Sequence, residues 1–288
     1  MKKIFVILLA LNMVAEVHAF TTISSTTISN SAYGANIGWV NFYADGTNGA
    51  VIGNFVCSGY IYGANVGWIN LGSGSALNGI RYQNNATNDF GVNNDGLGNL
   101  SGYAYGANIG WINFETNGNP KVNLQTGVLS GYAYGANVGW ISLSNFFAVV
   151  KTDSLFPGTD SDGDGIPDAW ERSIAGNLTT LTGTGDADLD GSSDVQEYLA
   201  DTNPLNPNDN LRITFFSHSP TLNTFTWTSV PSRNYKLQRR DDLNLGFPWL
   251  DITGTMVPDS GATTTRSVSD SPVPNRFFRV GALLPLSP

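Results

Sequence analysis

Carboxylate side chains recur at one spacing in two twelve-residue stretches of this chain, residues 160–171 and 186–197. Both stretches read Asp-x-Asp-x-Asp-Gly-x-x-Asp-x-x-Glu. A hard cation such as Ca²⁺ takes about six to eight oxygen ligands, and this spacing lets one loop wrap around the ion. The sequence therefore predicts two calcium loops and about two bound Ca²⁺ ions.

Each position of the motif has a defined role in such a loop. The sixth residue, Gly165 or Gly191, permits the sharp turn, and the seventh supplies a backbone carbonyl. Five carboxylates so close together would repel one another strongly, which disfavours the alternative of two solvated acidic turns that bind nothing. The predicted ligands are Asp160, Asp162, Asp164, Ile166, Asp168 and Glu171 in the first loop and Asp186, Asp188, Asp190, Ser192, Asp194 and Glu197 in the second.

A short helix is expected after each loop. Trp170 and Ile174 stand one helical turn apart and precede Gly176, a residue type that favours helix ends. Apolar residues at helical spacing also follow the second loop. Pro157-Gly158 leaves no room for a full helix before the first loop, so the pair is EF-hand-like in its loops but lacks the entering helix.

The phrase Asp-Ser-Asp-Gly-Asp-Gly-Ile-Pro-Asp-Ala-Trp-Glu at residues 160–171 resembles the thrombospondin type 3-like and dockerin-like calcium repeats of bacterial surface and secreted proteins. The resemblance covers roughly residues 158–207 and is stronger toward the thrombospondin repeats. It implies calcium-dependent folding and a spacer or docking role.

The negative charge of the chain is concentrated around these loops. Residues 152–210 hold thirteen acidic residues and one basic residue, Arg172, which gives a net charge of −12. Residues 20–150 hold four acids and two bases, and residues 211–288 hold five acids and eight bases. Because no basic stripe appears, nucleic acid is disfavoured as a partner.

The first residues have the features of a secretory signal peptide. Two lysines precede an apolar run over residues 4–14, and Val17-His18-Ala19 is a small-residue cleavage site. Residues 1–19 are therefore predicted to be removed near Ala19, and the protein to be secreted or held at the cell surface. The apolar run is too short for a spanning helix, so no membrane span is expected in the mature chain.

Residues 20–150 contain one phrase four times, with tryptophans at positions 39, 68, 111 and 140. Apolar residues alternate on either side of Gly-Ala-Asn-x-Gly, which predicts a β-hairpin in each copy, with a third strand before it. We expect these units to stack on one another or to form a small sandwich. Cys57 occupies the place of Leu100 and Leu129 in later copies, which favours a small buried side chain.

The aromatic side chains of the repeats have two interpretations. The tryptophans are expected to form the core of a repeat that is poor in leucine and valine. For the outward-facing tyrosines, a structural role and a sugar-binding face are both open, because aromatic rings stack on pyranose faces.

Residues 211–288 are predicted to form a small β-sandwich after a linker that contains Asn203-Pro204. This part is similar to the fibronectin type III-like modules at the end of many bacterial exported proteins. The expected strands cover residues 211–216, 224–229, 235–239, 249–252, 263–268 and 276–280. The whole chain is thus expected to be mainly β, with calcium loops and two small helices over residues 151–210.

Enzymatic activity is not expected. His218 is the single histidine of the predicted mature chain, it lies in an expected Ser-His-Ser-Pro turn, and no nucleophile motif accompanies it. The first hypothesis is a non-catalytic exported calcium-binding protein, active in surface adhesion or display with an extracellular glycan or another surface protein as partner. The alternative is a carbohydrate-binding protein that uses the repeat tyrosines; a hydrolase with an unrecognised site is the third.

Overall fold

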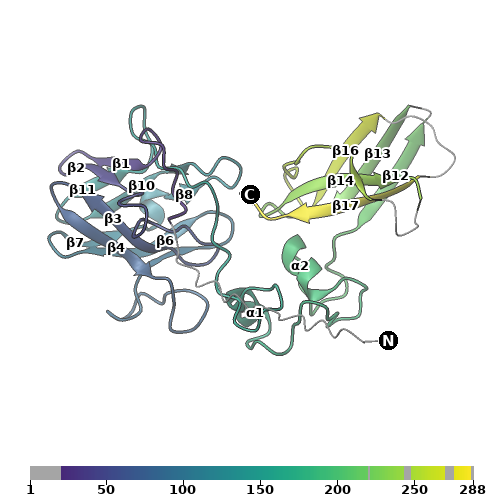
Figure 1. The fold of residues 1–288 in the computed structure, drawn as a ribbon, viewed down its shortest axis with the longest axis horizontal. Helices are drawn as coiled ribbons and strands as arrows, with labels where there is room; N and C mark the ends of the chain where they lie inside the picture. Colours follow the sequence, from purple (N-terminus) through teal and green to yellow (C-terminus); the bar gives the residue numbers. More distant parts are fainter. Residues whose placement is uncertain (1–20, 220, 243–247, 270–275, 287–288) are drawn as a thin grey trace, which may run out of the picture.

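The computed structural model describes residues 21–219, 221–242, 248–269 and 276–286 (Figure 1). The described part is mainly β, with antiparallel sheets and two short α-helices, as the sequence predicts. The predicted signal peptide lies outside the described residues. Among the described residues, no helix combines the length and the apolar character that a membrane crossing requires.

Each copy of the repeated phrase forms one antiparallel hairpin, closed by Gly-Ala-Asn-x-Gly. The hairpins are β1 (Ser31–Gly34) with β2 (Gly38–Asn41), β3 (Ser58–Gly63) with β4 (Gly67–Ser73), β6 (Leu100–Gly106) with β7 (Gly110–Asn113), and β10 (Tyr132–Gly135) with β11 (Gly139–Ser142).

The four hairpins join into one closed ring of strands. Strand β2 pairs with β3, β4 with β6, β7 with β10, and β11 returns to β1 (Figure 1). The expectation of stacked units or a sandwich in this part is therefore wrong: the hairpins close on themselves, which leaves no edge within the ring. Short additional strands lie beside it, namely β5 (Val92–Asn94) and the pair β8 (Lys121–Val122) with β9 (Leu129–Ser130), together with the 3₁₀ turn η1 (Thr116–Gly118).

The inside of the ring is filled by small and branched side chains. Successive residues of a strand point to opposite faces, so Ile69 points inward where its neighbour Trp68 points outward. The residues that alternate with the aromatics are all buried: Ala32, Val40, Ile61, Ile69, Ala104, Ile112, Ala133 and Ile141. Cys57, Leu100 and Leu129 belong to the same core, as the repeat alignment predicts.

The tryptophans of the repeats are exposed, so the prediction that they form the core is wrong. Between 43% and 51% of the surface of Trp39, Trp68, Trp111 and Trp140 is accessible. The physical reason is room: the interior of an eight-stranded closed sheet is only wide enough for modest side chains to fill it. Alanine and isoleucine occupy that space, and the indoles take the outer face.

One end of the ring is closed by the hairpin loops themselves. In each loop the residue between Asn and Gly is buried, for example Ile37 and Val66. The side-chain amide of each Asn donates to the backbone carbonyl of that residue in the neighbouring copy. These four hydrogen bonds run from Asn36 to Val138, Asn65 to Ile37, Asn108 to Val66 and Asn137 to Ile109, at 3.0 to 3.1 Å.

The acidic segment follows the ring after Phe156. Pairing with the ring continues past the predicted boundary at residue 150, because Phe156 forms a parallel bridge with Gly53. Helix α1 (Asp168–Ile174) and helix α2 (Asp194–Ala200) come next, each beginning inside an acidic loop. Their small core consists of Ile166, Trp170, Leu181 and Tyr198.

The described residues of the C-terminal unit form two three-stranded sheets around one core. Phe225, Trp227, Tyr235 and Leu237 are buried between them. His218 lies on an exposed strand rather than in the expected turn, and its Nδ1 is 2.7 Å from the amide oxygen of Asn223. The strands, in sheet order, are β12 (Ile213–Ser219), β13 (Leu222–Thr228) and β16 (Thr263–Ser269), then β15 (Leu250–Asp251), β14 (Asn234–Arg240) and β17 (Phe277–Leu283).

Candidate metal centre

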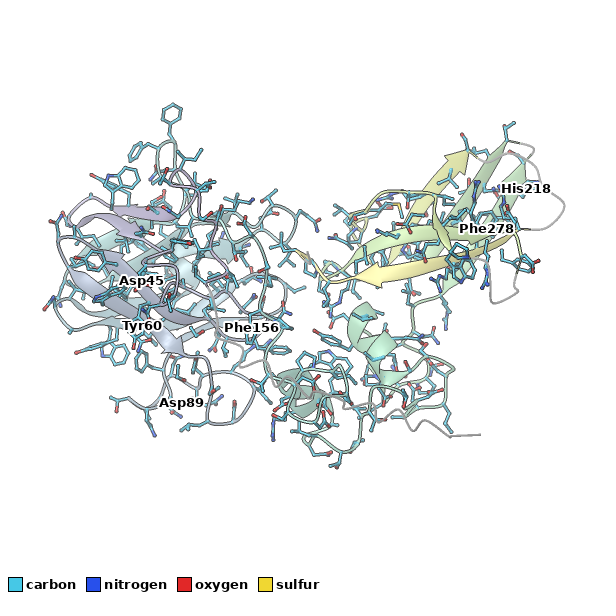
Figure 2. All side chains as sticks on the ribbon, in the orientation of Figure 1. Asp45, Tyr60, Asp89, Phe156, His218 and Phe278 are labelled. Carbon is cyan, nitrogen blue, oxygen red and sulfur yellow. The ribbon has the colours of Figure 1, made fainter. Side chains whose placement is uncertain are left out.

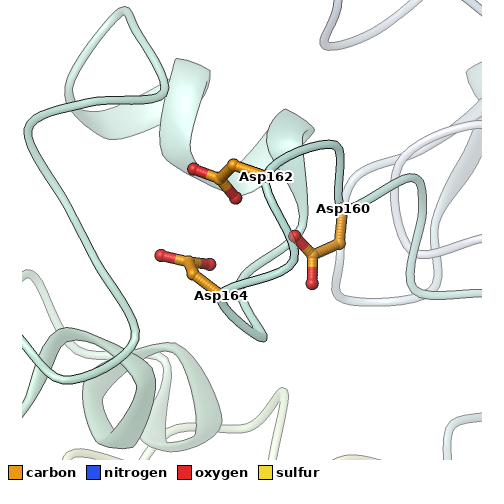
Figure 3. Close-up of side chains that lie close together, drawn as sticks. All are labelled: Asp160, Asp162 and Asp164. Carbon is orange, nitrogen blue, oxygen red and sulfur yellow. The ribbon is translucent and has the colours of Figure 1, made fainter. Parts of the chain in front are cut away.

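Three carboxylates of the first acidic loop lie close together. Oxygen atoms of Asp160, Asp162 and Asp164 are all within 4.8 Å of one another. Figure 3 shows the side chains of Asp162 and Asp164 turned toward a common space beside the loop. The sequence spacing of these three residues therefore brings them together in space as predicted.

The same carboxylates also shape the loop. Asp160 accepts hydrogen bonds from the backbone N–H groups of Gly163 (2.8 Å) and Gly165 (2.9 Å), and Asp164 accepts one from Ile166 (2.9 Å). The two glycines have φ values of +76° and +95°, which side chains rarely adopt. Glycine at both positions lets the loop turn around its own carboxylates without the strain that a side chain would meet.

Glu171, the closing residue of the first loop, carries the strongest sign of a cation. Its side chain is fully buried, and neither carboxylate oxygen has a hydrogen-bond partner among the described residues. One oxygen of Asp164 is also buried without a hydrogen-bond partner among the described residues. Burial, followed by the charges of Asp162 and Asp164, raises the pKa of Glu171 to about 7. A buried carboxylate without a partner is costly, and a cation would remove that cost.

The second loop repeats this arrangement. Oxygens of Asp186, Asp188 and Asp190 again lie within 4.8 Å of one another. Asp186 accepts from the N–H groups of Asp190 (3.1 Å) and Gly191 (3.0 Å). One oxygen of Asp188 is buried without a partner.

Glu197 closes the second loop and is almost completely buried. Its Oε1 accepts from the hydroxyl of Thr202 (3.2 Å), whereas Oε2 has no partner among the described residues. Burial, followed by the charge of Asp188, raises the pKa of Glu197 to about 7. The side-chain donors of both loops are carboxylate oxygens, which suit hard cations such as Mg²⁺, Ca²⁺ and Mn²⁺.

The ninth residues, Asp168 and Asp194, are held differently from the other predicted ligands. Both oxygens of Asp168 accept from Ser161, from its N–H (2.7 Å) and its hydroxyl (2.6 Å). Asp194 accepts from the N–H groups of Ala187 (3.0 Å) and Thr182 (2.8 Å). They lie outside the two aspartate triads, at the first residue of each helix, and tie the start of the loop to the helix.

The two seventh residues also differ from each other. The side chain of Ile166 is fully buried in the small core of the segment, whereas Ser192 is half-buried. The N–H of Ser192 donates to Asp190 (2.7 Å), as that of Ile166 does to Asp164. Both residues thus sit at the same turn, and their predicted role as carbonyl ligands stays a prediction.

Two residues beside the second loop were not predicted from the sequence. Asn210 donates to Asp190 (2.8 Å), and Arg212 in turn donates to Asn210 (3.1 Å). Both residues lie in or after the expected linker, where no spacing motif singles them out. They connect the second loop to the start of the C-terminal unit.

No family model matches this chain, and the comparisons with curated proteins and with solved structures give no match either. The case for a metal centre therefore depends on the geometry of the two loops.

The acidic segment is tied to the units on both sides. The buried Arg233 donates to the carbonyls of Leu199 (2.9 Å) and Tyr198 (2.8 Å) at the end of α2. On the other side, Phe55 of the N-terminal unit packs against the small core. Figure 2 shows Phe156 where the ring meets this segment, and His218 far from it in the C-terminal unit.

Proposed function

We propose that this chain is a non-catalytic, exported calcium-binding protein in which two Ca²⁺ ions hold a connector between two β units. Its expected work is adhesion or display at a cell surface. The observation that carries the proposal is Glu171, a fully buried carboxylate with no hydrogen-bond partner among the described residues, next to a triad of aspartates. The second loop repeats the arrangement around Glu197.

Calcium would act here through charge and position. Residues Asp160, Asp162, Asp164 and Glu171 would hold one ion, and Asp186, Asp188, Asp190 and Glu197 the other. The ion would neutralise carboxylates that otherwise repel one another and would supply the missing partner of the buried glutamates. Each loop leads directly into a helix, so fixing the loop also fixes the helix.

The position of the loops supports a structural role rather than a signalling one. A calcium sensor exposes an apolar surface when its helices open. Here the apolar faces of α1 and α2 pack on each other and on both neighbouring units, through Phe55 and Leu284. We therefore propose that calcium stiffens the joint.

Export is part of the proposal and is supported by the composition of residues 1–19, with two lysines, an apolar run and Val17-His18-Ala19. An extracellular location would also supply calcium at concentrations that weak loops can use, since extracellular modules bind at about 10⁻⁴ to 10⁻³ M.

The decisive test is a titration of the protein with Ca²⁺ by calorimetry, together with limited proteolysis in calcium or chelator. We expect about two bound ions per chain in the titration. In the proteolysis, we expect cleavage between residues 152 and 210 only when the chelator is present. Glu171→Gln and Glu197→Gln should each weaken binding. Glu115→Gln changes an exposed glutamate of the ring and should leave binding unchanged. The proposal would be refuted if the titration shows no heat of binding and if calcium leaves the melting temperature unchanged.

A further inference from the structure

The outer face of the ring carries a belt of exposed aromatic side chains. Single exposed apolar residues are normal in soluble proteins, whereas exposed apolar residues that cluster together can mark an interaction surface. Nine of these side chains each expose 40% to 51% of their surface. This aromatic belt consists of Tyr33, Trp39, Tyr60, Tyr62, Trp68, Tyr103, Tyr105, Trp111, Tyr132, Tyr134 and Trp140.

Three copies of the repeat present the same rigid triad. In the second copy, the ring of Trp68 lies 5.0 Å from that of Tyr62 and 6.2 Å from that of Tyr60. The corresponding distances are 4.9 and 6.1 Å in the third copy, around Trp111, and 4.9 and 6.1 Å in the fourth, around Trp140. Paired strands hold each triad in place, so little conformational freedom would be lost on binding.

A shallow hollow with polar side chains adjoins each of these three tryptophans. Amide side chains recur in all three hollows and offer both donors and acceptors of hydrogen bonds. The polar neighbours are Asn48 beside Trp68, then Asn84, Asn85 and Thr87 beside Trp111, and finally Asn113, Glu115 and Asn117 beside Trp140.

The charge of this unit indicates what kind of ligand fits. Residues 20–150 carry only four acids and two bases, and Glu115 is the single charged residue that lines these hollows. An aromatic ring beside neutral amides matches a sugar, which offers an apolar C–H face to the ring and hydroxyl groups to the amides. A polyanion would find no opposite charge in these hollows, and a basic peptide would find only Glu115, in one of the three.

The first copy differs from the other three. Ser31 stands where the others have their first tyrosine, and this absent tyrosine is what sets the first copy apart. An added phenylalanine is found in two copies: Phe147 lies 6.1 Å from Trp39, and Phe90 lies 5.0 Å from Trp111 in the third copy. The arrangement around Trp39 is therefore not the shared triad.

We propose that the aromatic belt binds neutral glycans, with one pyranose in the hollow beside the tryptophan of the second, third and fourth copies. The three triads lie on different hairpins around the ring rather than in one patch, which suits several chains or several residues of one polymer. This inference does not depend on calcium, because the belt lies outside the acidic segment.

The test measures binding of the full protein to soluble neutral glycans (cello- and chito-oligosaccharides, xylan, mannan and galactan) by affinity electrophoresis and calorimetry. Alginate and heparin serve as acidic probes. We expect a neutral glycan to bind in calcium and in chelator alike. Trp68→Ala, Trp111→Ala and Trp140→Ala should each weaken binding at the copy that it alters about tenfold, since about 1.4 kcal/mol corresponds to that factor. The control is Phe146→Ala, because Phe146 is fully exposed outside the belt.

A melting temperature equal to that of the unmodified protein shows that a variant is folded, and the outcomes below apply to such variants. Loss of binding in the triple tryptophan variant, with the control unaffected, supports the proposal. Binding to acidic probes alone, or no binding to any neutral glycan, overturns it. Self-association in sedimentation that the triple variant abolishes would also overturn it, because the belt would then be an interface between copies of this chain.

Discussion

The ring of Trp170 meets the ring of Tyr198 edge to face, with centroids 5.4 Å apart. Trp170 belongs to the helix that begins in the first acidic loop, and Tyr198 to the helix that begins in the second. A Cβ on Gly183 would lie within 2.0 Å of the carbonyl oxygen of Asp164, so the connecting segment also lies directly on the first loop. The two loops therefore form one packed body.

This packing predicts that the two calcium sites are coupled. Glu171→Gln should weaken calcium binding at the first site and also at the second, because the second helix packs against the first. Calorimetry of the unmodified protein should show positive cooperativity, and Tyr198→Ala should reduce it. Two independent sites in the unmodified protein, or cooperativity that persists unchanged in Tyr198→Ala, would contradict this expectation.

The stability of the calcium-free protein should fall as the pH rises from about 4.5 to about 7. Glu171 and Glu197 have an ordinary pKa of 4.5, which the folded state raises to about 7. Below pH 4.5 both states hold these protons. Above it the unfolded chain releases them first, and the folded state must then ionise two buried carboxylates. Denaturant titrations in chelator at several pH values measure the effect.

The double variant Glu171→Gln with Glu197→Gln provides the control for this pH dependence. Its stability should change much less over the same window, because neither residue can then ionise. Saturating calcium should reverse the trend, since the ion binds the ionised carboxylates and its affinity increases with pH. An unmodified protein whose calcium-free stability rises from pH 5 to pH 7 would contradict the raised pKa values.

Leu189 should be replaceable with a gain in stability. It has a φ of +63°, a backbone conformation that costs a side chain about 1 to 2 kcal/mol, and it is 86% exposed. The equivalent residue of the first loop is Gly163, with φ of +76°. After the entropy cost of glycine, Leu189→Gly should stabilise the protein by about 0.5 to 1 kcal/mol.

Leu97 offers a matched control for this substitution. It is also an exposed leucine in a loop, at 53% exposure, but it is not among the residues with positive φ. Leu97→Gly should destabilise slightly, because it adds freedom to the unfolded chain without relieving strain. Equal effects of the two substitutions on the free energy of unfolding would show that backbone strain at Leu189 is absent.

The asparagines of the hairpin loops should contribute to stability as a group. Each donates one hydrogen bond to the preceding copy, so Asn65→Ala combined with Asn108→Ala should cost about 1 to 2 kcal/mol. The exposed Asn88 serves as the control, and Asn88→Ala should cost little. Thermal melting provides the measurement, and a double variant as stable as the control would contradict the role of these bonds.

Local patterns in the sequence were sufficient for the elements and for the acidic triads. Period-two alternation predicts the hairpins, and the Asp spacing brings Asp160, Asp162 and Asp164 together because both depend on neighbours along the chain. Alternation does not tell which face of a strand is inside. Side-chain volume would have indicated the inner face, because Ala104 and Ile112 fit a narrow interior. The larger Tyr105 and Trp111 do not.

Contacts between distant parts of the chain were beyond local reasoning. Strands β4 and β6 pair across a long insertion. No residue pattern in either strand predicts this pairing. Asn210 and Arg233 likewise act on the acidic segment from outside its motif. Such contacts depend on how complete units meet, which the spacing of residues within one unit does not determine.

The return of β11 to β1 has a consequence for how such a protein can change over time. An open row of repeats can grow or shrink by one copy, since each new copy meets only its neighbour. Here a fifth copy would have to break an existing seam, and the loss of one would leave two unpaired edges. A longer insertion between copies, such as the one between the second and third, leaves all four seams intact, whereas a change in the number of copies does not.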